Sequence, residues 1–408
     1  MKKIILLLLL LFIMPTIYAS TSISAKIGDK YYDTLGEAIS AASSEDIITL
    51  ISNIELDSTL LINKTVNINL NGNDISANEK VFVVNGGFLT ISGKGTIKEN
   101  KPNYGAIMLA GSNEPTDEKY SVVSIGSDVT LEGWSGIFIN HNESKSYGVQ
   151  VYLEGKINAV NDVSGNNGTG IYVNGNIKDK EESPVINIMD GAEITSTGSG
   201  LYIAGYSTFN VGDAYIEGMR SGIGIKSGKL IIDGATVVCN GEDTTPTEGY
   251  NNGIKSSGTA IQIESNSGYA GNIEIDISSG TFKSKNSNVI YEYIGKGTNS
   301  KIYSMSISGG NFISGKDKDV FSFSDSFKNI HSGFISGGKY STNPSSYLKS
   351  GYTVVNDDMY EVVKSTMKEI NDNKMNSLNN KTSFIKSLII LLISLIIIIY
   401  INRNKIFN

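Results

Sequence analysis

The stretch PVINIMDGAEITSTGSGLYIAGYSTFNVGDAYIEGMRSGIGIKSGKLIIDGATVVC, residues 184–239, contains one short pattern three times. Each copy has two apolar residues in alternation, then a few polar or glycine residues, then another apolar residue. The copies are INIMDGAEI ending at Ile194, FNVGDAYI ending at Ile216 and LIIDGATV ending at Val237. Alternation with a period of two is typical of β-strands, and a repeated unit is typical of a coil whose units stack.

The same pattern continues in both directions along the chain. Further copies end at Ile75, Ile97, Leu131, Ile157, Phe282, Phe312 and Tyr340. Aligned on their second apolar residue, the ten copies predict one column: Leu70, Ile91, Ile125, Leu153, Ile188, Val211, Ile232, Ile277, Ile307 and Ile335. Leu50 adds a rung before Leu70. Among the ten copies, the shortest spacing between aligned residues is 21, as from Val211 to Ile232, and longer spacings indicate inserted loops.

A second apolar segment follows nearly every copy, as in GIYV (170–173), GLYI (200–203) and GIGI (222–225). Two strand types alternating in fixed order predict an all-β chain, a single-stranded parallel β-helix of about 10–11 rungs and about 50 Å in height. The alternative is a sandwich of antiparallel hairpins. The coil is favoured because Asn-Gly and Asp-Gly hairpin turns do not recur regularly between the strands.

The two ends of the chain differ from the repeat. Residues 1–19 have two lysines, an apolar run and a small residue at the end, which predicts a secretory signal peptide. Residues 384–401 are apolar all round and long enough for a transmembrane helix, and the basic residues in 402–408 predict a cytoplasmic tail. We therefore expect a single-pass membrane protein at the cell surface, with its N-terminal domain extracellular. Wall attachment is not favoured, because no LPxTG-like motif precedes the helix.

Four further segments complete the predicted organisation. Residues 20–45 form an N-terminal cap, in which Thr34 and Glu37 predict a capping box that opens a short helix. Residues 46–341 form the parallel β-helix. Residues 342–363 form a C-terminal cap with a closing hairpin, and the polar residues 364–383 form a stalk.

Two segments carry a resemblance to a known superfamily. The opening YYDTLGEAISAASSEDIITLISNIELDSTLLINKTVNINLNGNDI (31–75) and the closing ISGGKYSTNPSSYLKSGYTVVNDDMYEV (335–362) resemble units of membrane-anchored Firmicutes surface proteins with the right-handed parallel β-helix of the pectin-lyase-like superfamily. The resemblance covers about residues 26–362 and implies a right-handed coil with an N-terminal helical cap. It does not select a function, because this superfamily contains lyases, glycosidases and adhesins.

The composition restricts the partners and the redox chemistry. Lysine and arginine number 34 against 41 acidic residues, and arginine occurs only at Arg220 and Arg403. This balance argues against nucleic-acid binding, which needs a basic surface. Cys239 is the only cysteine, so no intramolecular disulfide can form. We interpret Cys239 as a buried side chain and His141 and His331 as surface residues.

Three aspartates are candidates for a ligand site. Asp190, Asp213 and Asp233 fall at nearly equivalent positions on three consecutive rungs, about 5 Å apart. Because each lies beside a glycine, they are interpreted first as turn residues that bond the backbone. The alternative is a site for a sugar or a calcium ion. The pair of Glu217 and Arg220 is interpreted as solvated turn charges.

The loops are the strongest indication of function. Insertions at 101–120, 161–169, 178–184, 240–257 and 295–301 are rich in Asn, Gly, Ser, Asp and Tyr. Loops on a rigid scaffold are where recognition residues concentrate. The following aromatic residues lie near them and predict an exposed surface for sugar rings: Trp134, Tyr172, Tyr202, Tyr206, Tyr250 and Tyr269. The alternative is that these aromatic residues are simply favourable in strands.

The sequence thus predicts a non-catalytic adhesin or glycan-binding surface protein, with an extracellular glycan or a host surface as its partner. The alternative is a polysaccharide lyase or glycoside hydrolase of the β-helix class, although no catalytic residue is assigned. No cofactor is expected apart from a calcium ion at the three aspartates.

Overall fold

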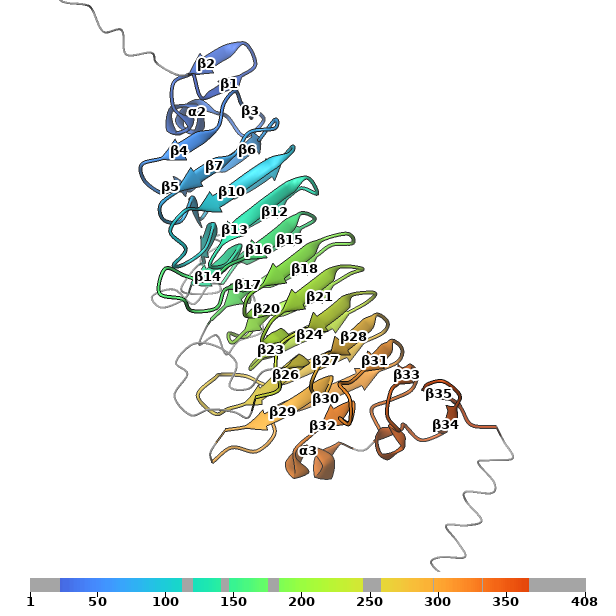
Figure 1. Cartoon of the computed structure of the whole chain (residues 1–408). Coiled ribbons are helices and arrows are strands. Elements are labelled where there is room, and N and C mark those ends of the chain that lie inside the picture. Colours follow the sequence, from blue (N-terminus) through green and yellow to red (C-terminus); the bar gives the residue numbers. More distant parts are fainter. Residues whose placement is uncertain are drawn as a thin grey trace, which may run out of the picture.

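The strands of the chain form three long sheets that run along the molecule (Figure 1). The computed structural model describes residues 23–111, 120–140, 147–174, 183–244, 258–295, 297–331 and 333–366. Strand order in each sheet advances in steps of three, and the strands within the coil pair in parallel. Each rung therefore contributes one strand to each sheet, which is the arrangement of a parallel β-helix.

We name the sheets A, B and C. Sheet A contains β2 (Lys30–Tyr32), β1 (Ala25–Ile27), β3 (Ile47–Leu50), β6 (Thr65–Asn69), β9 (Phe88–Ser92), β12 (Ser121–Ile125), β15 (Val149–Leu153), β18 (Val185–Ile188), β21 (Thr208–Val211), β24 (Gly228–Ile232), β27 (Ile273–Ile277) and β30 (Ile302–Ile307). Sheet B contains β4 (Ile54–Leu56), β7 (Ile75–Ala77), β10 (Gly95–Glu99), β13 (Val129–Gly133), β16 (Lys156–Ala159), β19 (Glu193–Ser196), β22 (Tyr215–Gly218), β25 (Thr236–Cys239), β28 (Thr281–Ser284), β31 (Asn311–Ile313), β33 (Lys339–Tyr340), β35 (Tyr360–Lys364) and β34 (Tyr352–Asn356). Sheet C contains β5 (Leu60–Ile62), β8 (Phe82–Asn85), β11 (Ile107–Ala110), β14 (Ile137–Asn140), β17 (Thr169–Val173), β20 (Ser199–Ile203), β23 (Ser221–Ile225), β26 (Thr259–Ser265), β29 (Ile290–Ile294) and β32 (Phe321–Ser322).

Each rung has three strands, and the prediction of two was wrong. The repeated pattern contains two strands and the turn between them: β21 ends at Val211, and β22 begins at Tyr215 after three residues. The polar or glycine residues of the pattern are this turn. Because the turn is so short, the apolar residue after it looked like a continuation of the same strand.

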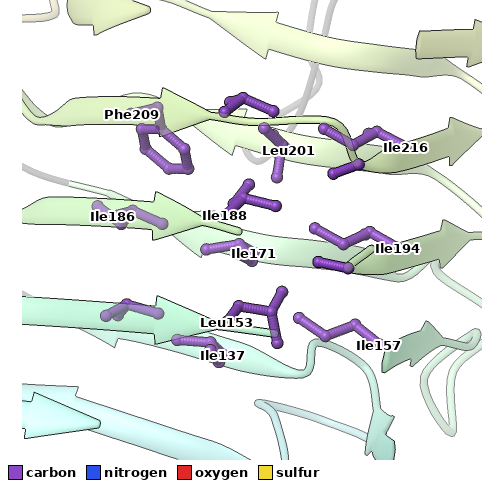
Figure 2. Close-up of a cluster of buried hydrophobic side chains, with 14 of the residues drawn as sticks. Ile137, Leu153, Ile157, Ile171, Ile186, Ile188, Ile194, Leu201, Phe209 and Ile216 are labelled. Carbon is purple, nitrogen blue, oxygen red and sulfur yellow. The ribbon is translucent and has the colours of Figure 1, made fainter. Parts of the chain in front are cut away.

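The residues that end the copies form one inward column in sheet B, as their equivalence predicts. The column, in order, is Ile54, Ile75, Ile97, Leu131, Ile157, Ile194, Ile216, Val237, Phe282, Phe312 and Tyr340. Figure 2 shows Ile157, Ile194 and Ile216 one above another beside the columns of the other sheets. The interior is thus a continuous apolar core.

The predicted column of sheet A is confirmed from Ile91 to Ile335 and is wrong at its start. Ile188, Val211 and Ile232 stack and are buried. Ile68, not Leu70, pairs with Ile91, and Ile48, not Leu50, pairs with Ile68. A shift of two residues keeps every apolar side chain on the inner face, so alternation alone cannot detect it.

Small residues at the entrance to sheet C explain the recurring Gly-Ile and Gly-Leu pairs. Gly136, Gly170, Gly200 and Gly222 stand immediately before the stacked residues of successive strands. A Cβ on Gly200 would lie 2.5 Å from Cγ2 of Ile216 in sheet B and 2.6 Å from the carbonyl oxygen of Gly222. Sheets B and C approach each other so closely at this corner that a side chain does not fit.

Both ends of the coil are covered. At the first rung, helix α2 (Leu35–Ala41) begins with the expected capping box of Thr34 and Glu37 and buries Leu35, Ala38 and Ile39. At the last rung, helix α3 (Asp325–Ile330), the 3-10 helix η2 (Ser345–Tyr347) and the antiparallel hairpin β34–β35 follow the coil. Aromatic rings, including Phe321, Phe323 and Phe334, pack against one another there.

The predicted signal peptide (1–19), most of the stalk, the transmembrane helix (384–401) and the tail (402–408) lie outside the described residues. Within the described part of the chain, no helix is long and apolar enough to cross a membrane.

Candidate functional site

The long loops all border sheet C. Connections from sheet A to sheet B are short throughout the coil, for example two residues between β9 and β10 and three between β24 and β25. In contrast, the insertions at 101–120, 161–169, 178–184, 240–257 and 295–301 each adjoin a strand of sheet C. Along the chain, the loops in which recognition was expected are therefore all connected to strands of one sheet.

Sheet C carries a column of apolar side chains on its outer face. Cross-strand pairing aligns, rung by rung, Leu61, Val83, Met108, Phe138, Tyr172 and Tyr202. The rings of Phe138 and Tyr172 are stacked at 4.9 Å and those of Tyr172 and Tyr202 at 4.8 Å. The distance between stacked rings therefore equals the distance between neighbouring strands of a sheet, about 4.8 Å.

The column changes from exposed to buried along its length. Leu61 is 55% exposed, whereas Tyr172 and Tyr202 are 4% and 2% exposed. The expectation that Tyr172, Tyr202 and Tyr206 are exposed is wrong, because each is buried. Burial also raises the pKa of Tyr172 far above its ordinary value, as expected for a hydroxyl in apolar surroundings.

The accessible part of the aromatic face is formed by Tyr104 and Trp134, which we call the aromatic shelf. Tyr104 is 43% exposed and Trp134 is half-buried. Both rings contact Phe138, with centroids 6.3 Å and 6.2 Å away, and Trp134 also lies 5.3 Å from Tyr172. The Nε1 of Trp134 donates a hydrogen bond to the carbonyl oxygen of Asn167.

Glu99 holds the aromatic shelf in place from beneath. Its side chain is 1% exposed. Oε1 accepts hydrogen bonds from the backbone N–H groups of Asn103 and Tyr104, and Oε2 accepts one from the N–H of Trp134. One carboxylate thus fixes both segments that carry the shelf. A further hydrogen bond, from the hydroxyl of Ser135 to the carbonyl oxygen of Tyr104, joins the same two segments.

A buried polar cluster lies beyond the other end of the column. The Nζ of Lys226, after β23, is 2.9 Å from Oε2 of Glu264 in β26, and the two side chains are 2% and 1% exposed. The Nζ of Lys226 also lies over the rings of Tyr202 and Tyr269. Lys301 donates hydrogen bonds to the carbonyl oxygens of Lys226 and Tyr269, and burial lowers its pKa to about 8.

Asp190, Asp213 and Asp233 lie at successive turns between sheets A and B, and the carboxylates of Asp190 and Asp233 accept hydrogen bonds there. Oδ1 of Asp190 accepts a hydrogen bond from the backbone N–H of Asp213. Oδ1 of Asp233 accepts bonds from the hydroxyls of Ser278 and Ser279, which lower its pKa. The contact of Asp190 agrees with the expected bond to the backbone, whereas Asp233 binds hydroxyl groups instead. In the described residues, no three His, Cys, Asp or Glu side chains are grouped as metal ligands.

The remaining candidates are placed apart from the aromatic shelf. Cys239 is buried, and burial raises the pKa of its thiol to about 11. The carboxylate of Glu217 accepts hydrogen bonds from Tyr215 and Asn240. His331 is bonded through Nε2 to the carbonyl oxygen of Ile302. Tyr250 and His141 lie outside the described residues.

Sequence reasoning missed Tyr104, Glu99 and the pair of Lys226 and Glu264. The position of Glu99, in register with the small inward residue Ala77, was a usable indication, because a charge at an inward position needs a buried partner. For Lys226 and Glu264, alignment of GIGI with AIQI gives the contact: Ile225 pairs with Ile263, and the charged residues follow directly.

No protein-family model, curated protein or solved structure matches this chain.

Proposed function

We propose that the protein is a non-catalytic glycan-binding surface protein, an adhesin, whose sugar-binding surface is the aromatic shelf of Tyr104 and Trp134. The proposal includes the sequence-based expectations of a right-handed coil of the pectin-lyase-like kind, a cleaved signal peptide and a membrane anchor at 384–401. The partner would then be an extracellular glycan or a host surface.

The observation that carries the proposal is the combination of partial exposure and fixed geometry at the shelf. Aromatic rings offer flat apolar faces on which the C–H face of a sugar packs. The rings of Tyr104 and Trp134 rest on Phe138, and their backbones are bonded to Glu99. A preorganised surface loses little conformational entropy when a ligand binds. The polar loops beside sheet C would supply hydrogen bonds to the sugar hydroxyls.

Binding without turnover is favoured over hydrolysis or elimination. A glycoside hydrolase needs two carboxyl groups that face the substrate, about 5–9.5 Å apart. Three glutamates are buried in the described part of the chain, and each carboxylate already has partners. Glu99 of sheet B binds backbone N–H groups, Glu264 of sheet C binds Lys226, and Glu292 of sheet C accepts hydrogen bonds from the hydroxyls of Ser265, Ser300 and Ser324. Their roles in the described part of the chain are structural.

The sole tryptophan of the sequence makes the proposal directly testable. Full-length protein is applied to a glycan array, and each hit is titrated while Trp134 fluorescence is followed. We expect a saturable change, with Tyr104→Ala weakening the affinity roughly tenfold or more. The control is Tyr303→Ala, which removes a tyrosine that is 66% exposed on sheet A.

Three results would contradict the proposal: hits that leave Trp134 fluorescence unchanged, equal losses in Tyr104→Ala and Tyr303→Ala, or no hits at all. Product analysis of each incubated hit separates binding from catalysis, because release of shorter or unsaturated sugars would establish the lyase or hydrolase alternative.

A further inference from the structure

The pair of Lys226 and Glu264 joins two neighbouring rungs on the outer side of sheet C. Ile225 of β23 pairs with Ile263 of β26, so the residues that follow stand side by side. The Nζ of Lys226 and the Oε2 of Glu264 are 2.9 Å apart, and both side chains are almost completely buried. Apart from this ion pair, Oε2 receives no hydrogen bond in the described part of the chain, although it is buried.

The surroundings of this pair are apolar on one side and hydrogen-bonding on the other. The rings of Tyr202 and Tyr269 have their centroids 5.3 Å and 4.5 Å from Nζ. The Tyr269 hydroxyl accepts a hydrogen bond from Nζ at 3.1 Å. The other carboxylate oxygen, Oε1 of Glu264, accepts a hydrogen bond from the side-chain amide of Asn266, also at 3.1 Å.

A buried ion pair is a poor source of stability, because removing both charges from water offsets most or all of their attraction. A covalent amide between the same two groups removes that penalty and leaves a neutral, compact link. The chain has a single cysteine and therefore no disulfide of its own that could perform this task. We propose that Lys226 and Glu264 condense to form an intramolecular isopeptide bond.

The reaction is a condensation that needs no oxidant, reductant or cofactor. Transfer of a proton from the ammonium group to the carboxylate gives an amine and a carboxylic acid. The Nζ lone pair attacks Cδ of Glu264, and the negative charge that develops on Oε1 is stabilised by the Asn266 amide. The Cδ–Oε2 bond then breaks, Oε2 leaves as water with two protons, and the Nζ–Cδ amide remains.

The position of the link explains its use. Lys226 and Glu264 stand on either side of the insertion at 240–257, which belongs to the longest step between aligned residues, that from Ile232 to Ile277. A crosslink that closes a long loop lowers the entropy of the unfolded chain and stabilises the folded one. The inference is independent of the proposed glycan binding.

Mass spectrometry of the purified, denatured full-length protein tests the proposal. We expect an intact mass lower by one water molecule and a branched tryptic peptide that joins residues 221–229 to residues 256–283, because an acylated Lys226 is not cleaved by trypsin. Lys226→Arg, which keeps the charge, and Glu264→Ala should both have the full mass of their chains. Lys226→Arg should also unfold at a lower temperature than the wild type.

A wild-type chain with its full mass, together with tryptic cleavage after Lys226, would overturn the proposal and leave a noncovalent ion pair. Loss of water that maps to any other pair of residues would overturn it equally. Because the wild type alone decides the outcome, a variant that fails to fold does not affect the test.

Discussion

The turns between sheets A and B are short in every rung, whereas the outer side of sheet C differs from rung to rung. At the A–B corner, turns of a few residues repeat along the coil and are bonded to the neighbouring turns, as when the N–H of Asp213 binds Asp190. Beside sheet C, loops of varied length adjoin aromatic rings, a buried carboxylate and a buried ion pair. The turns between sheets A and B stabilise the stacking of the rungs. The outer side of sheet C can vary in sequence and carry a specific surface without disturbing that stacking.

The difference follows from the physics of the turns. A short turn bonded to its neighbour accepts no insertion without losing those bonds, so its geometry repeats. A loop that leaves the coil entirely can lengthen with little entropic cost. Function is therefore expected where the repeat is interrupted, and the following experiments test that division.

The largest effect is expected from the core that supports both regions. Ile216→Ala removes a fully buried side chain from the column of sheet B and should lower the free energy of unfolding by about 2–5 kcal/mol. The matched control is Ile47→Ala, because Ile47 is 56% exposed, and its loss should change stability by less than about 0.5 kcal/mol. Denaturant unfolding measures both, and equal effects would contradict the stacked core.

This core is the part of the molecule that the sequence predicts best. Inward residues alternate regularly, so Ile188, Val211 and Ile232 were placed correctly. The predictions of Leu70 and Leu50 were each wrong by two residues, which alternation cannot detect. The outer face is different. Tyr172 and Tyr202 occupy outward positions, and alternation cannot show that other parts of the fold bury them.

The polar contacts of sheet C were less predictable for the same reason. The contact between Lys226 and Glu264 follows only once GIGI and AIQI are aligned across the long insertion between them, and the bonds of Glu99 depend on how two loops return to the coil. Neither follows from the period of the strands.

A smaller loss of stability, with a loss of binding, is expected from Glu99→Ala. The substitution leaves the N–H groups of Asn103, Tyr104 and Trp134 without their acceptor and should lower the free energy of unfolding by about 1–3 kcal/mol. Glycan affinity should fall as well, because the aromatic shelf loses its support. The control is Glu154→Ala at an exposed A–B turn, and unchanged affinity in Glu99→Ala would separate Glu99 from the shelf.

The smallest effect is expected from pH. Burial lowers the pKa of Lys301 to about 8, below the ordinary lysine value of 10.5. Between these values the unfolded chain binds more protons than the folded one, so the stabilising free energy rises as pH increases from 8 towards 10.5. The melting temperature of the wild type, relative to that of Lys301→Met, should rise across this range. A flat or falling difference would show that Lys301 stays solvated.

Hydrogen–deuterium exchange of the full-length protein, with and without a glycan selected on the array, tests the division between the two regions most directly. We expect the glycan to slow exchange in residues 99–109 and 133–138, which carry Glu99, Tyr104 and Trp134, and to leave exchange at the turns between sheets A and B unchanged. Slower exchange at the turns of Asp190, Asp213 and Asp233, with no change at the aromatic shelf, would contradict this division.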